Sequence, residues 1–167
     1  MAAAGQGGAA AAFRPDDHEL VDRFLRRKLD GEPLLADGAC FIHDVDVCSA
    51  APGDLAGTYA PAPGAAADRP VWYFFSPARY VGPRPRNSLH VGSSGGIWRL
   101  ASYPEPVKGS AAGGSKRHLL YMERSAESDN FYVSKWLMAE YSIPKNAGEG
   151  LVLCKVYTSP RPSRQRP

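Results

Sequence analysis

Long apolar runs, a paired set of cysteines and the features of a signal peptide are all missing from this sequence of 167 residues. No stretch approaches the roughly 20 apolar residues that a membrane-spanning helix needs. The three cysteines, Cys40, Cys48 and Cys154, are an odd number, so we expect buried thiols in a reducing compartment and no disulfide framework. The start, MAAAGQGGAAAA, lacks the basic end and apolar centre of a signal peptide. These absences predict a protein that stays inside the cell and off the membrane.

Catalytic motifs are missing as well. The sequence contains no GxxxxGK[ST], GxSxG or HExxH, and its four histidines have no neighbouring serine or cysteine that would form a nucleophile pair. Cys40, His43 and Cys48 are irregularly spaced and lack a second pair at zinc-like spacing, which disfavours a zinc site. We therefore predict no enzyme activity, no cofactor, no bound metal and no small-molecule substrate.

Proline and glycine are abundant, with 15 and 17 residues, and favour a β-rich domain with many turns. Residues 16–30 form the clearest helix, because Asp16 and Glu19 have capping-box spacing and the apolar residues that follow recur at helical spacing. The ranges 51–68 and 78–96 are expected to be loops. Residues 40–49 suggest a short strand or turn. The length fits one domain, which we place at residues 13–158 between a disordered Ala/Gly-rich lead, 1–12, and a basic disordered tail, 159–167.

Strands are predicted at residues 71–75, 97–102, 117–124, 131–143 and 150–157. The first is a dense run of β-forming residues and is expected in the sheet interior. In the second, simple alternation places Ile97, Arg99 and Ala101 on one face, and Trp98, Leu100 and Ser102 on the other. One helix followed by strands and turns predicts an α+β fold with a mixed or antiparallel sheet.

Charge is divided unevenly along the chain. Residues 1–78 carry six Lys/Arg against eleven Asp/Glu, a net charge of −5, whereas residues 79–124 carry eight against two, a net charge of +6. One basic face suits an acidic partner such as nucleic acid, and a strand with a few cations can enter a DNA major groove. A solvated surface that binds nothing explains the charge alone slightly better.

Seven blocks, read together, resemble the plant NAC domain. They occur in this order: DDHELVDRFLRRKLDGEPL, VDVCSAAPGDL, VWYFFSP, RPRNS with GGIWRLAS, KRHLLYMERS, KWLMAEYSI and LVLCKVY. The family's WYFFSP block is matched in full by Trp72 to Pro77, and the resemblance covers about residues 13 to 158. It implies a twisted, mainly antiparallel β-sheet packed against a few helices, in a nuclear protein that binds double-stranded DNA as a dimer and regulates transcription.

The resemblance also implies a DNA-reading strand, which falls here on Trp98 to Ser102. The residues that it assigns to DNA binding come from this strand, the preceding loop and the two blocks that follow: Arg84, Arg86, Trp98, Arg99, Ser102, Lys116, Arg117 and Lys135. This copy departs from the family pattern, since Tyr103 and Glu105 stand where the family has basic residues. The loop before the strand is also about four residues longer. Each lost phosphate contact lowers the slope of the salt dependence by ~0.9.

The dimer motif of the family, LPPGFRF, falls on the Ala-rich lead. Alignment on the helix places Phe13 at the last Phe of the motif, the motif arginine on Ala12, and the partner glutamate on Glu19. Phe13, Arg14 and Glu19 are therefore the candidate dimer residues, as a homodimer or a heterodimer with other NAC proteins. An alternative function is an interaction module that has lost base reading and modulates intact NAC partners by heterodimerisation.

Overall fold

The computed structural model describes residues 12–34, 38, 40–64, 69–81, 84–92, 94–144 and 150–160. Most of the predicted lead, 1–11, and residues 161–167 of the predicted tail lie outside these ranges. None of the helices in the described ranges is long and apolar enough to cross a membrane.

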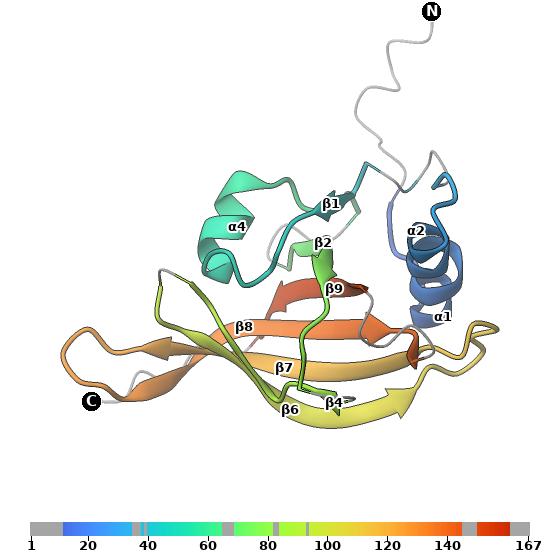
Figure 1. Ribbon diagram of the computed structural model, residues 1–167. Helices are drawn as coiled ribbons and strands as arrows, with labels where there is room; N and C mark the ends of the chain where they lie inside the picture. The colour runs from blue at the N-terminus through green and yellow to red at the C-terminus, as the bar shows by residue number, and fades with distance from the viewer. Residues whose placement is uncertain are drawn as a thin grey trace, which may run out of the picture.

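A seven-stranded sheet organises the described chain, in the order β1-β2-β9-β8-β7-β6-β5 (Figure 1). Its neighbours are antiparallel except β1 and β2, which are parallel. The strands are β1 Ile42–Asp44, β2 Val71–Pro77, β5 Ser88–His90, β6 Ile97–Pro106, β7 Ser115–Arg124, β8 Phe131–Ser142 and β9 Leu151–Thr158. A second sheet pairs β3 Tyr80–Val81 with β4 Arg84–Pro85. The predicted α+β class with a mainly antiparallel sheet is confirmed.

The predicted helix is present as α1 Asp17–Glu19, a π-helical turn Leu20–Leu25 and α2 Arg26–Leu29. The backbone N–H of Asp16 donates to the Glu19 carboxylate at 3.1 Å, which satisfies an otherwise unpaired donor before the first turn. Leu20, Val21, Phe24 and Leu25 are all buried, as their spacing predicts. The π-helical turn was not predicted, since it leaves no distinct pattern in the sequence.

The prediction of a loop over 51–68 was wrong in part, because α4 covers Pro52–Thr58. Pro52 stands in the first turn, where its missing N–H costs nothing, whereas Gly53 and Gly57 lower the intrinsic helix propensity of the segment. Burial of Pro52 and Leu55 compensates for that low propensity. The loop predicted over 78–96 was also wrong in part, since it contains β3, β4 and β5.

Two apolar cores lie on opposite faces of the sheet, because neighbouring residues of β2 alternate between them. Trp72 and Phe74 join the core beneath α4, whereas Tyr73 and Phe75 join the core beneath the α1–α2 segment. Figure 1 shows these two helical elements at different ends of the curved long strands. Both faces of β2 are thereby covered, which explains its continuous run of large apolar residues.

The cysteines differ in environment. Cys48 and Cys154 are buried, as expected, and burial raises the pKa of the Cys48 thiol to about 11. Cys40 is exposed, so the expectation of a buried thiol was wrong there. The His43 ring nitrogen Nε2 lies 3.1 Å from the Ala60 carbonyl oxygen, a partner unrelated to the cysteines.

Candidate nucleic-acid interface

The strand that carries the candidate site, β6, does not alternate regularly. Leu100 pairs with Leu119 of β7, but the next registered pair is Ser102 with His118, because a bulge intervenes. Leu119 and His118 are adjacent and therefore face opposite sides of the sheet. Ser102 thus shares the face of Arg99, which pairs with Leu120, and the predicted placement of Ser102 beside Trp98 was wrong.

Arg99 is exposed and has no ion-pair partner in the described part of the chain. Ser88 of β5 lies opposite Arg99 in the antiparallel register. The N–H of Leu100 donates to the Asn87 carbonyl at 2.8 Å, which ties the preceding loop to the strand. Arg86, next to Asn87, is held close to β6 by this contact.

Arg84 and Arg86 are exposed on the arginine loop, residues 84–87, and neither forms an ion pair with a described residue. The N–H of Arg86 donates to the Arg79 carbonyl at 3.0 Å, which closes the loop beside β3. A hollow of about 450 Å³ adjoins it, lined by Arg79, Tyr80, Arg86, Ser88 and His90 among others. Sequence reasoning missed Ser88 and His90, because β5 has no recognisable strand pattern.

Trp98 lies in the core. Its side chain is 0% exposed and packs against Tyr121 with ring centroids 5.2 Å apart. Gly96 permits this arrangement, since a Cβ there would overlap the Tyr121 ring. The indole Nε1 has no hydrogen-bond partner among the described residues. In this conformation Trp98 supports β6 from beneath and does not present its side chain to DNA.

Arg117 is 4% exposed and is also unavailable for direct contact. Its Nε donates to the Glu140 carboxylate at 2.7 Å, and its Nη1 donates to the Arg86 carbonyl at 2.7 Å. Arg117 therefore fixes the arginine loop to the sheet from inside. This is a positioning contact that the spacing of residues in the sequence does not reveal.

Lys116 is half-buried, and its ammonium group already has partners within the chain. Its Nζ donates to the Asp17 carboxylate at 2.9 Å and lies 5.7 Å from the centroid of the Tyr141 ring. The Tyr141 hydroxyl donates to the same carboxylate at 2.6 Å. Burial by itself would raise the pKa of Asp17, but the hydrogen bonds from Tyr141 and Lys116 hold it below the ordinary value.

Ser102 and Lys135 complete the predicted set. The Ser102 hydroxyl accepts from the His118 N–H at 3.2 Å, and burial lowers the pKa of the His118 ring beside it. Lys135 is exposed, with its Nζ 5.8 Å from the Trp136 ring centroid. Across β7, Arg99 aligns through Leu120 with Leu137, two residues after Lys135.

The candidate dimer residues differ in availability. Phe13 is buried in its own chain, where its ring centroid lies 5.4 Å from that of Phe24 and 5.1 Å from that of Tyr73. Glu19 pairs with Arg23 at 3.2 Å. Arg14 is exposed and unpaired in the described part of the chain.

Comparison with known proteins identifies the chain's relatives. Residues 9–143 match the family described as No apical meristem (NAM) protein. NAC domain-containing protein 18 of Arabidopsis thaliana is 32% identical over 80% of this chain and 40% of the relative. NAC domain-containing protein 68 of Oryza sativa subsp. japonica is 31% identical over 87% of this chain and 46% of the relative. NAC transcription factor 56 of Arabidopsis thaliana is 29% identical over 91% of this chain and 44% of the relative.

The chain spans less than half the length of these three relatives. The family match nevertheless covers most of the chain, including both helical elements and the candidate strand β6. Together with the observed sheet, this match shows that the chain belongs to the NAM, or NAC, family.

Proposed function

We propose that the protein is a nuclear regulator of transcription that binds double-stranded DNA, with β6 in the major groove and the arginine loop on phosphates. The observation that carries the proposal is that Arg84, Arg86 and Arg99 are exposed and have no ion pair with a described residue, with Arg99 on β6 and the other two on the arginine loop that is tied to β6 through Asn87. Strands can enter the major groove, and β5 and β6 are the two outermost strands at one edge of the seven-stranded sheet.

Each residue has a distinct role in this proposal. Arg99 reads a base edge, because its planar guanidinium matches the two acceptors of guanine. Arg84 and Arg86 bind phosphates without regard to sequence, and Lys135 adds a cation two strands away. Ser102 lies on the same face as Arg99 and lines the contact further along β6. Trp98, Arg117 and Lys116 act through their support of the interface.

Association between two subunits is part of the proposal. Arg14 is the exposed candidate at the dimer surface, whereas Phe13 and Glu19 hold the segment that presents it. A homodimer or a heterodimer with another NAC protein would double the contacted DNA.

A second function, modulation of intact NAC partners without base reading, is favoured by the far part of β6. Tyr103 is 79% exposed there, and Glu105 is exposed two residues later. A carboxylate repels phosphate, so this part of the strand disfavours DNA binding.

Selection of duplexes from a random pool, at low and near-physiological salt, tests the proposal. We expect the intact protein to enrich a sequence motif and Arg99→Ala to bind without enriching it. Arg69→Ala is the matched control, because Arg69 is also exposed and without an ion pair among described residues. It precedes β2, which lies near the opposite edge of the sheet from β6. Absence of binding at low salt would refute DNA binding, and co-purification with another NAC protein would then support the second function.

A further inference from the structure

Four polar side chains line the hollow beside the arginine loop, which we call the β5 hollow. Its described lining consists of residues 78–80, 86 and 88–90, and its volume is about 450 Å³. The Tyr80 hydroxyl, the Arg86 guanidinium, the Ser88 hydroxyl and the His90 ring form no hydrogen bond or ion pair with any described residue. Unpaired polar groups that converge on one hollow make it a candidate binding site.

Strand pairing sets the direction of the two polar side chains on β5. Ser88 and His90 are two residues apart and lie on one face of the strand, whereas Leu89 between them is buried in the core on the other face. Ser88 also stands opposite Arg99 in the antiparallel register. The polar residues that β5 gives to the hollow therefore share the sheet face of the proposed base-reading arginine.

The backbone of Arg86 is fixed at both of its polar groups. Its N–H donates to the Arg79 carbonyl at 3.0 Å, and its carbonyl accepts from the Arg117 Nη1 at 2.7 Å. Arg117 is held in the sheet by Glu140, while the side chain of Arg86 stays exposed. A cation on a fixed backbone is preorganised, because less freedom is lost when an anion binds to it.

The charge of Arg86 is not compensated by a described carboxylate. The described lining of the β5 hollow contains no acidic residue. Asp46 accepts from the Arg79 Nη2 at 2.7 Å, and Glu140 accepts from the Arg117 Nε at 2.7 Å, so each of these carboxylates already has an arginine of its own. The hollow therefore presents an uncompensated positive charge, which suits an anionic ligand.

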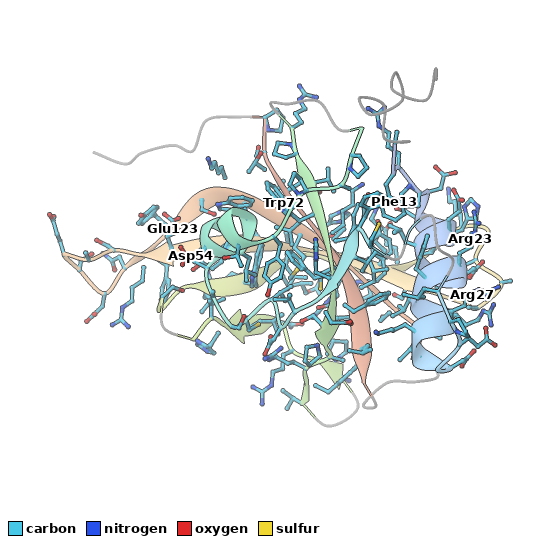
Figure 2. All side chains as sticks on the ribbon, turned by 90° about the horizontal axis from the view of Figure 1, so that it is seen from above. Phe13, Arg23, Arg27, Asp54, Trp72 and Glu123 are labelled. Atoms are coloured by element: carbon cyan, nitrogen blue, oxygen red, sulfur yellow. The ribbon has the colours of Figure 1, made fainter. Side chains whose placement is uncertain are left out.

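Other cationic regions of the described chain lack this property. A hollow of about 690 Å³ at the start of the α1–α2 segment, which we call the mixed-charge hollow, carries the carboxylates of Asp16, Asp17 and Glu105 beside its lysines. Figure 2 shows Arg23 and Arg27 on the helix, where each forms an ion pair with a glutamate, at 3.2 and 3.8 Å. Of the two hollows, the β5 hollow is the one that suits an anion.

The donors of the β5 hollow match a phosphate group. A guanidinium presents its N–H groups in a fork that fits phosphate oxygens, and serine and tyrosine hydroxyls commonly donate to phosphates. A histidine ring carries an N–H donor in either protonation state. A phosphate also offers more acceptor oxygens than a carboxylate, so it can satisfy more of these four side chains at once.

We propose that the β5 hollow is a pocket for one phosphate group, held by the Arg86 guanidinium, the hydroxyls of Tyr80 and Ser88, and the His90 ring. In the complex with DNA, this group is a backbone phosphate beside the bases that Arg99 contacts, a part of the inference that rests on the proposed function. The pocket thereby adds Tyr80, Ser88 and His90 to the DNA contact.

Titration of the full chain with inorganic phosphate, at constant ionic strength against chloride, tests the pocket by NMR of the backbone amides. We expect saturable shifts at Arg86, Ser88 and His90, and none at Lys108 in the mixed-charge hollow. Tyr80→Phe and Ser88→Ala should each weaken phosphate binding about fivefold or more, since each removes one hydrogen bond to the ligand.

Duplex binding by the same variants distinguishes a DNA phosphate from a free one. Tyr80→Phe should weaken a selected and a mismatched duplex by the same factor, because phosphate contacts carry no sequence information. Tyr59→Phe is the matched control, since Tyr59 is also half-buried but lies at the end of α4, outside the hollow. Saturable phosphate binding without any duplex binding would keep the pocket, assign it to a free phosphate and refute the proposed function alone.

Two outcomes would overturn the proposal. Linear shifts at Arg86 and Ser88 that match those in chloride, together with a duplex affinity that Tyr80→Phe leaves unchanged, would mean that the hollow takes no phosphate. Equal losses of affinity in Tyr80→Phe and Tyr59→Phe would assign the effect to the packing of the fold and not to the hollow.

Discussion

Arg99 and Arg117 lie on neighbouring strands of the same sheet, yet they are used in opposite ways. Arg99 faces solvent without an ion pair among the described residues, whereas Arg117 is buried between Glu140 and the Arg86 carbonyl. The same division runs through the basic segment 79–124, where Arg79, Lys116, Arg117 and Arg124 form ion pairs and Arg84, Arg86, Arg99 and Lys108 form none among the described residues. Half of its cations hold the fold, and half are available to a partner.

The largest expected effect on stability comes from replacing Arg117, the buried arginine of this pair. Arg117→Ala leaves Glu140 buried without its partner and should lower the free energy of unfolding by about 3–5 kcal/mol. Arg99→Ala should change it by less than about 0.5 kcal/mol, as for an ordinary surface position. Urea denaturation followed by tryptophan fluorescence measures both, and similar losses would show that burial does not separate the two arginines.

Replacement of Trp98, which packs beneath β6, should have the next largest effect on stability. Trp98→Ala should cost about 3–5 kcal/mol, because it empties a fully buried site against Tyr121. Thermal unfolding measures the loss. Trp98→Phe is the conservative control and should lose less, since it fills most of the volume and removes the unpaired indole N–H; an equal loss would contradict a packing role.

On the exposed side, Arg99→Ala should reduce discrimination between the selected duplex and a mismatched one by about 1–3 kcal/mol. Fluorescence anisotropy with the two duplexes measures the difference. Arg99→Lys keeps the charge and loses the bidentate geometry, so it should retain affinity better than discrimination. Unchanged discrimination in both variants would remove Arg99 from base reading.

Arg84→Ala should weaken binding to all duplexes about equally and lower the slope of log affinity against log salt by ~0.9. A salt titration checks this, with Arg69→Ala as the matched control. A change in sequence preference with an unchanged slope would show that Arg84 contacts a base and not a phosphate.

The smallest expected effect concerns Asp17, which anchors Lys116. Its pKa is lowered in the folded state, so its contribution to stability is present above the ordinary aspartate pKa of about 3.9 and is lost as pH falls through the folded value. Because Asp17 and Lys116 are partly exposed, the loss should be below about 1 kcal/mol. Denaturation at pH 7 and pH 3 measures it, and Asp17→Asn should reduce the difference.

Prediction succeeded where the pattern was local. The apolar spacing around Leu20 and Phe24 predicted the buried helix face, and the dense run at Trp72–Phe75 predicted an interior strand. It failed at α4, where burial of Leu55 outweighs the low helix propensity of two glycines, and at Ser102, where a bulge reverses the face. Neither burial nor a bulge can be inferred from composition.

The sequence by itself determined the α+β class, the resemblance to the NAC family and the position of the candidate strand, because these depend on the order and periodicity of residues along the chain. Only the tertiary structure decided which cations are available. Arg117 meets Glu140 across 23 residues, and Lys116 meets Asp17 across 99, so each pairing depends on how the strands and the helix come together. A charge is free or occupied according to its neighbours in space, which the linear sequence does not specify.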